Sequence, residues 1–145
     1  MKIFRCDFTS VDLSCCTRSL KVLALELECK VDTRTWEVLS NGFENLNEIL
    51  IPNIPSGFIP LVVKDKKHLR ILEVGEISNK LMNIICNYCQ STLTQFTFDG
   101  GQITYSGVIS LFLCKSTLKS LKIRNPKYLT KYSLYILSRN LDNLR

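Results

Sequence analysis

One short motif recurs along the chain, and its spacing restricts the possible folds more than any other feature. The motif is Leu-x-x-apolar, usually followed by a further apolar residue two positions later. Its leading leucines are Leu20, Leu46, Leu69, Leu93, Leu118 and Leu141. Successive leucines are separated by 26, 23, 24, 25 and 23 residues. A period of this size, kept in phase through five complete copies, predicts a stack of similar structural units.

Each motif predicts a short β-strand. Apolar residues two positions apart, such as Leu23 and Leu25, point to the same side of a strand. A single short strand cannot bury them, whereas identical units stacked in a parallel sheet bury each pair against its neighbours. Each strand must then return to the start of the next, and a right-handed crossover through a helix is strongly preferred.

The segments between the motifs have the features of these returning helices. Residues that favour a helix N-cap precede four of them: Asp32, Ser78, Thr104 or Ser106, and Thr130. The second unit is crowded by Pro52, Pro55 and Pro60, so we expect only a short helix there, over about residues 58–64. Pro52 has no N–H to give to a sheet and is expected at the end of its strand.

The sequence therefore predicts one α/β domain over residues 1–145. We expect a right-handed solenoid with a parallel sheet on its concave face and short helices on its convex face. Complete repeats begin near residues 20, 46, 69, 93 and 118. A partial unit over residues 1–19 precedes them, and a truncated unit starts at residue 141.

Cysteine recurs four residues before a leading leucine, at Cys16, Cys89 and Cys114. The segments Cys89-Gln-Ser-Thr-Leu93 and Cys114-Lys-Ser-Thr-Leu118 closely resemble the cysteine-containing subtype of leucine-rich repeat, which occurs in F-box/leucine-rich-repeat proteins. The resemblance covers residues 20–145. Where that subtype usually carries Cys or Asn just after the strand, this chain has Glu28, Ile54, Ile77, Gly101 and Pro126.

The resemblance implies a function as well as a fold. Such a chain is expected to recognise protein substrates for a cullin-type ubiquitin ligase through its concave face. No F-box, the helical segment that docks the ligase adaptor, is recognisable in the sequence, and there is no room for one before residue 20. We therefore expect a fragment, a truncated product, or a divergent member whose exposed last strand associates with another molecule.

The predicted partner-binding residues are the strand residues that point away from the helices. They are Val22, Glu26, Glu48, Leu50, Ile71, Glu73, Gln95, Asp99, Lys122 and Arg124. Gly75 occupies a further outward position in the same alternation. The first part of this surface mixes apolar and acidic residues and the last part is basic, which suits a protein or peptide with the opposite order of charge. At any single position, an ordinary solvent-facing strand residue is the simpler interpretation.

Basic residues are concentrated toward the C-terminus. Residues 1–113 carry eleven Lys and Arg against twelve Asp and Glu, whereas residues 114–145 carry eight against one. The alternative function is binding of nucleic acid or another acidic partner through Lys119, Lys122, Arg124 and Lys127. A solvated polar edge explains the same residues more simply, so nucleic acid is not the expected partner.

No constellation of residues predicts an enzyme, a cofactor or a metal. Cys86 and Cys89 have C-x-x-C spacing, but they fall near the end of a helix, where a thiol is not activated. A zinc site needs two more ligands, and the single histidine, His68, is expected in a surface turn. Asp99 is followed by Gly100 and Gly101, a turn in which we expect glycine to provide a positive φ.

The cysteines also bear on the cellular compartment. All seven are found without a disulfide-type framework, several of them inside apolar periodic segments, which favours reduced thiols packed as small hydrophobic residues. No Asn-x-Ser/Thr acceptor and no run of about 18 apolar residues occurs. The expectation is an intracellular protein, cytoplasmic or nuclear, that does not cross a membrane.

Overall fold

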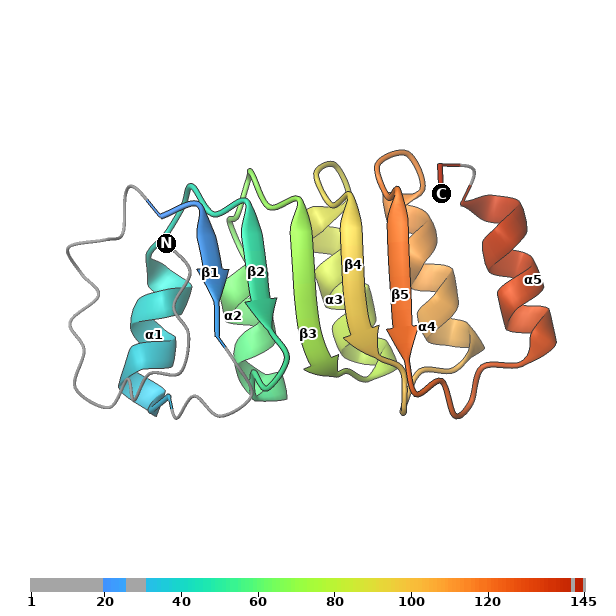
Figure 1. Cartoon of the computed structure of the whole chain (residues 1–145), viewed down its shortest axis with the longest axis horizontal. Helices are drawn as coiled ribbons and strands as arrows, with labels where there is room; N and C mark the ends of the chain where they lie inside the picture. The colour runs from blue at the N-terminus through green and yellow to red at the C-terminus, as the bar shows by residue number, and fades with distance from the viewer. Residues whose placement is uncertain (1–19, 26–30, 142, 145) are drawn as a thin grey trace.

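The computed structural model describes residues 20–25, 31–141 and 143–144, and in them strands and helices alternate (Figure 1). The strands are β1 (Val22–Ala24), β2 (Glu48–Ile51), β3 (Ile71–Glu76), β4 (Gln95–Asp99) and β5 (Ser120–Arg124). They form one parallel sheet in the order β1-β2-β3-β4-β5. The predicted α/β fold is confirmed for this part of the chain. The expected partial unit over residues 1–19 lies outside the described residues.

The helices form a single layer behind the sheet in Figure 1. They are α1 (Thr33–Asn41), α2 (Ile59–Val63), α3 (Asn79–Cys89), α4 (Tyr105–Ser110) and α5 (Lys131–Asn140). Two 3-10 turns, η2 (Ser56–Phe58) and η3 (Leu111–Cys114), extend α2 and α4. Among the described residues, the opposite face of the sheet is not covered by any helix.

The predicted helix starts are confirmed. The side chains of Asp32, Ser78 and Thr130 accept hydrogen bonds from backbone N–H groups three residues later, at 2.7, 3.4 and 3.2 Å. These bonds satisfy donors that the first helical turn leaves free. Thr104 is also an N-cap, but its hydroxyl accepts instead from the Asn79 side chain, at 2.8 Å. As the prolines predicted, α2 is short and Pro52 directly follows β2.

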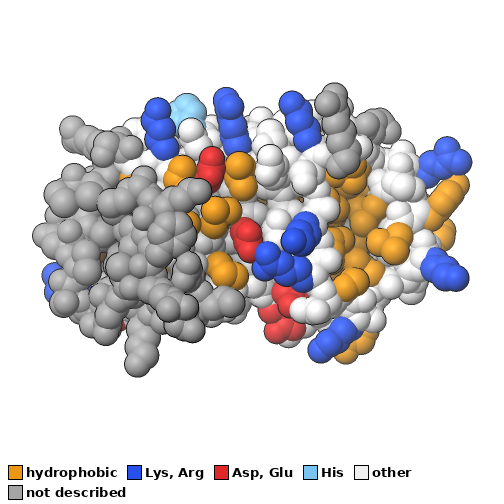
Figure 2. All heavy atoms as spheres, viewed as in Figure 1, with side chains coloured by type: hydrophobic (Ala, Val, Ile, Leu, Met, Phe, Trp, Pro, Cys, Tyr) orange, Lys and Arg blue, Asp and Glu red, His pale blue; other side chains and the backbone are white. Residues whose placement is uncertain are grey.

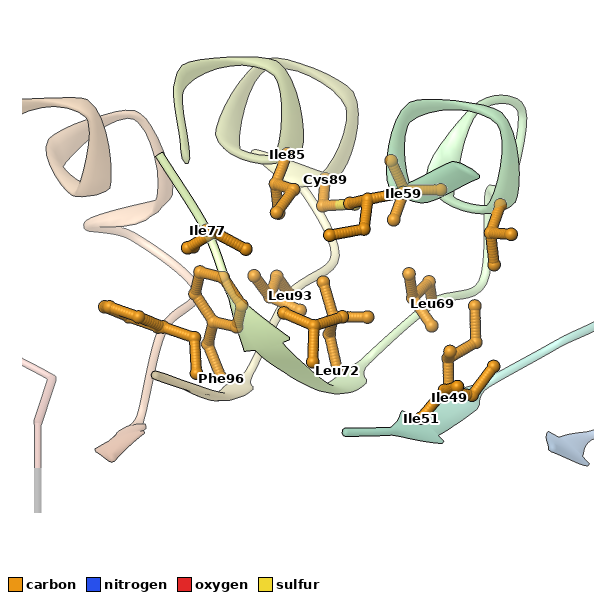
Figure 3. Close-up of a cluster of buried hydrophobic side chains, with 14 of the residues drawn as sticks. Ile49, Ile51, Ile59, Leu69, Leu72, Ile77, Ile85, Cys89, Leu93 and Phe96 are labelled. Carbon is orange, nitrogen blue, oxygen red and sulfur yellow. The ribbon is translucent and has the colours of Figure 1, made fainter. Parts of the chain in front are cut away.

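The core lies between the sheet and the helical layer, and all six leading leucines are buried in it. Figure 3 shows Ile49, Ile51, Leu72 and Phe96 of the sheet directed toward Ile59, Ile85 and Cys89 of the helical layer. The register aligns each inward position with its equivalent in the next strand, as in the row Leu23, Ile49, Leu72, Phe96 and Leu121. Leu121 is only half-buried, because β5 is the last strand of the sheet.

The beginnings of the strands are joined by a repeating pair of backbone hydrogen bonds. One carbonyl of each unit accepts from two successive N–H groups of the next unit, at 2.8–3.1 Å. The accepting carbonyls belong to Lys21, Asn47, Arg70 and Thr94. The residue that follows each leading leucine therefore has the same position along the strand direction in every unit. We call these five residues the strand-start row: Lys21, Asn47, Arg70, Thr94 and Lys119.

One outward position differs from the simple alternation that the sequence suggested. Glu73 is paired with Thr97, but Glu76 is paired with Asp99, so β3 carries one extra residue between these pairs. The prediction that Gly75 occupies the outward position in register with Asp99 is wrong. A β-bulge adds one residue in this way, and Gly75 lies at the bulge, where an added Cβ would stand 2.1 Å from the carbonyl oxygen of Pro52.

The expectation for the turn after β4 is also wrong. No described glycine has a positive φ, whereas the non-glycine residues Phe43, Asp65 and Asn125 do, at 61°, 59° and 46°. Gly100 instead permits a close approach between units, because a Cβ there would lie 2.6 Å from Cγ2 of Ile123. The glycine is required for space rather than for backbone conformation.

Candidate functional site

The predicted binding residues lie on the strands and face away from the helices. Glu26 is outside the described residues, and the other nine are exposed or half-buried. We call the outward residues of β1–β5 the sheet face. Figure 2 shows hydrophobic, acidic and basic side chains interspersed over the strands on this face.

Two neighbouring rows give the sheet face its character. In the first, Glu48 of β2 is in register with Ile71 of β3. In the second, Leu50 of β2 is in register with Glu73 of β3. Each half-buried apolar side chain therefore has a carboxylate beside it on the neighbouring strand. A surface of this kind offers contact area and polar specificity together, which is the usual composition of a protein interface.

An ion pair changes the predicted order of charges on the sheet face. The Arg124 guanidinium on β5 lies 2.5 Å from a carboxylate oxygen of Glu73 on β3. The pair crosses over β4, which lies between these strands. The acidic and basic parts of the surface thus partly neutralise each other, and the exposed Lys122 is the cation of β5 that remains outside this pair.

Asp99 has a structural role that the sequence did not indicate. One of its carboxylate oxygens accepts from the Gly101 N–H at 3.0 Å, and the other accepts from the Asn125 side-chain amide at 2.7 Å. Asp99 therefore joins the turns that follow β4 and β5. The neighbouring Glu76 is exposed and was missed, because no feature of the sequence alternation indicates a bulge.

The basic residues of the alternative nucleic-acid site are spread along β5 and the loop that follows it. Lys119 precedes β5 and Arg124 ends it, so the two are separated by about 16 Å of extended strand. Lys127 lies in the exposed loop beyond β5. The exposed tyrosines near the C-terminus belong to the helical layer and its loops, where Tyr105 and Tyr132 have ring centroids 5.7 Å apart.

A polar groove at the strand-start edge was not predicted. Its volume is about 640 Å³, and its lining includes the cations Lys67, Arg70 and Lys119 together with His68. His68 lies in an exposed turn, as expected. A signal was present in the sequence, because a basic residue follows the leading leucine in three of the five complete units, as Lys21, Arg70 and Lys119. Of these three residues only Lys119 was among the predicted binding residues, because the position lies just outside each strand.

The described cysteines Cys86, Cys89 and Cys114 are free and buried, which agrees with their predicted role as small core residues. Cys114 donates a weak hydrogen bond to the Cys86 carbonyl, at 3.8 Å. A hydrogen bond with the Cys114 thiol and then burial raise the pKa of Cys86, and burial raises the pKa of Cys89 to about 12. The thiolate forms of the C-x-x-C pair are thus disfavoured, the opposite of what a redox pair requires.

Comparison with known proteins adds no relative: no family model, curated protein or solved structure matches this chain. Within the described residues, no group of three or more His, Cys, Asp or Glu side chains is placed to hold a metal ion. In the same part of the chain, none of the helices combines the length and the apolar character needed to cross a bilayer.

Proposed function

We propose that this chain is a leucine-rich repeat solenoid that binds a protein partner through its sheet face. One observation carries the proposal: apolar and charged side chains alternate in register on the face of the sheet that the described helices leave free. Leu50 and Ile71 supply half-buried apolar area, and Glu48 beside Ile71 supplies a polar group that can select a basic partner.

The equivalence of the units supports the repeat class. Cys89 ends α3 and Cys114 ends η3, and the carbonyl of each accepts a hydrogen bond from the leading leucine four residues later. The distances are 3.0 Å for Leu93 and 2.9 Å for Leu118. Both cysteines are fully buried. The same residue thus has the same local structure in two successive units, as expected for a repeat.

On this basis we propose that the partner is a substrate of an intracellular cullin-type ubiquitin ligase. The support is the resemblance of the two Cys-x-x-x-Leu segments to those of F-box/leucine-rich-repeat proteins. In this proposal the chain supplies substrate recognition, and the F-box function is supplied by another segment or another chain.

The test compares two double variants by quantitative affinity purification from cells. Leu50→Glu with Ile71→Glu places charge on the sheet face. The matched control, Leu61→Glu with Ile109→Glu, makes the same change at two exposed positions of the helical layer, each 44% exposed. Equal melting temperatures of the variants and the wild type establish that the fold is retained.

The expected result is a set of partners that the sheet-face variant loses and the control keeps. Equal recovery by both variants would refute binding through the sheet face. Among the partners, a cullin-ligase adaptor together with a protein whose ubiquitination depends on this chain is the expected result for the ligase proposal. Specific partners without any ligase component would restrict the proposal to a binding module.

A further inference from the structure

The groove at the strand-start edge contains cations and hydroxyl groups that the proposed function does not use. Arg70 and Lys119 belong to the strand-start row, and Lys67 lies in the turn just before β3. All three are exposed, and all three line the groove. No carboxylate lines it among the described residues, and the nearest acid along the chain, Asp65, precedes Lys67 by two residues.

Backbone hydrogen bonds fix the spacing of two of the residues that carry these charges. The carbonyl of Arg70 accepts from the N–H of Thr94, and the carbonyl of Thr94 accepts from the N–H of Lys119, both at 2.8 Å. Arg70 and Lys119 are therefore two strand spacings apart, about 10 Å, with Thr94 between them.

Hydroxyl groups complete the lining. The Thr94 hydroxyl donates to the Arg70 carbonyl at 3.0 Å, and the Thr117 hydroxyl donates to the Gln90 carbonyl at 3.2 Å, which stabilises the turns that form the groove. Ser91 and Ser116 lie at the exposed tips of these turns and also line the groove. Their hydroxyls are available to donate to an oxyanion.

We propose that this groove binds phosphate groups, carried either by a small oligophosphate or by a phosphorylated protein side chain. The arginine guanidinium can donate two parallel hydrogen bonds to phosphate oxygens, and the lysine ammonium groups add positive charge. The serine hydroxyls supply neutral hydrogen-bond donors. The backbones of Arg70 and Lys119 are about 10 Å apart, so both side chains can reach one phosphate between them or two phosphates of the same ligand. The proposal does not depend on the sheet face as a binding site.

Nucleic acid fits the groove less well. Proteins that bind single strands combine a basic groove with aromatic side chains on which the bases stack. None of the described tyrosines, phenylalanines or the tryptophan lines this groove. The groove therefore lacks the tyrosine, phenylalanine or tryptophan platform on which single-stranded nucleic acids usually stack.

The experiment measures binding of sodium tripolyphosphate to the full chain by isothermal titration calorimetry at low ionic strength. The groove variant is Arg70→Gln with Lys119→Gln. The control is Lys80→Gln with Lys131→Gln, which removes the same charge from two exposed positions outside the groove. We expect the groove variant to bind at least about tenfold more weakly and the control to stay within about twofold of the wild type.

Both variants should have the melting temperature of the wild type, which establishes that a change in binding is not a loss of folding. Equal weakening by both variants would mean general charge attraction and would overturn the proposal, as would no binding by the wild type. A phosphoserine peptide that displaces tripolyphosphate identifies a protein source of the phosphate. Tripolyphosphate binding that the phosphoserine peptide does not displace identifies a small oligophosphate as the ligand. Oligouridylate that binds through Arg70 and Lys119 and is not displaced by tripolyphosphate would also overturn it.

Discussion

The Arg124 guanidinium and the Glu73 carboxylate, 51 residues apart in sequence, meet at 2.5 Å over the intervening strand β4. Their side chains are 38% and 26% exposed, so solvent screens the attraction but does not remove it. The pair ties the last strand to the middle of the sheet without any contact through the core.

We predict a coupling free energy of about 0.5–1 kcal/mol between these two side chains. The measurement is a double-mutant cycle of Glu73→Gln and Arg124→Gln in urea unfolding. The coupling should decrease in about 1 M salt, where exposed charges are screened. Strictly additive single variants at low salt would contradict the prediction.

Burial differs along the row of inward leucines, and stability should differ with it. Leu72 is 1% exposed in the middle of the sheet, whereas Leu121 on the last strand is half-buried. Leu72→Ala should lower the free energy of unfolding by about 2–5 kcal/mol. Leu121→Ala should cost less than about half as much, since less apolar area leaves the core. Equal losses in chemical denaturation would mean that the end of the sheet is covered in solution.

The bulge in β3 predicts a strong position effect for glycine. Gly75→Ala places a Cβ against the carbonyl of Pro52, a backbone atom that cannot rotate away, and should destabilise the protein by about 1–3 kcal/mol. Gly57→Ala is the control, because nothing lies within 4 Å of its added Cβ. That variant should stay within about 0.5 kcal/mol of the wild type. Thermal unfolding of the two variants compares them directly, and a neutral Gly75→Ala would disprove the close approach.

Lys66 should make stability depend on pH. It is 5% exposed and donates to the Gly42 carbonyl at 2.6 Å. Burial lowers its pKa below the usual 10.5, although Asp65 and Glu44 partly oppose the shift. Between the lowered pKa and about 10.5, the unfolded chain binds more protons than the folded chain, so folding is favoured as the pH rises.

The measurement compares the wild type with Lys66→Met, which removes the titrating group and keeps a side chain of similar length. The difference in unfolding free energy should move in favour of the wild type as the pH is raised toward about 10. A difference that does not vary with pH would show that Lys66 has its ordinary pKa in the folded protein.

The buried thiols should resist alkylation. Because burial raises the pKa of Cys89 to about 12, its reactive thiolate is scarce at neutral pH and is also shielded from solvent. Cys86 and Cys89, whose pKa values are both raised, should react with iodoacetamide at least about a hundredfold more slowly in the folded protein than in the unfolded one. Peptide mapping by mass spectrometry measures each site separately. Rapid labelling of Cys89 in the native protein would contradict its placement in the core.

The leucine period was sufficient to predict the strands, their order and the row of buried residues, because a two-residue alternation admits few alternatives in a parallel sheet. The N-caps at Asp32, Ser78 and Thr130 were predictable for a similar reason, since short polar side chains satisfy free N–H groups at helix starts. The bulge at Gly75 was not predictable, because the two-residue alternation carries no sign of the close approach between Gly75 and the Pro52 carbonyl.

The candidate surfaces were predicted less completely. Alternation placed Glu73 and Arg124 on the same face, but only the three-dimensional arrangement shows that they pair with each other. The groove was missed because its cations come from two units that are not adjacent in the chain, those that contain β3 and β5. Lys67 and Arg70 are near neighbours in sequence, but Lys119 is about 50 residues away. Side chains of different units come together only through the hydrogen bonds that stack those units.

The sequential strand order has a consequence for how the chain folds. Every strand pairs with the next strand along the chain, so each pairing closes a loop of only 23 to 26 residues. Closing such a loop costs little more entropy for the last unit than for the first. We therefore predict that a nucleus of β3 and β4 templates β2 and then β5, one unit at a time. Unfolding of one terminal unit leaves the pairing of all the others intact.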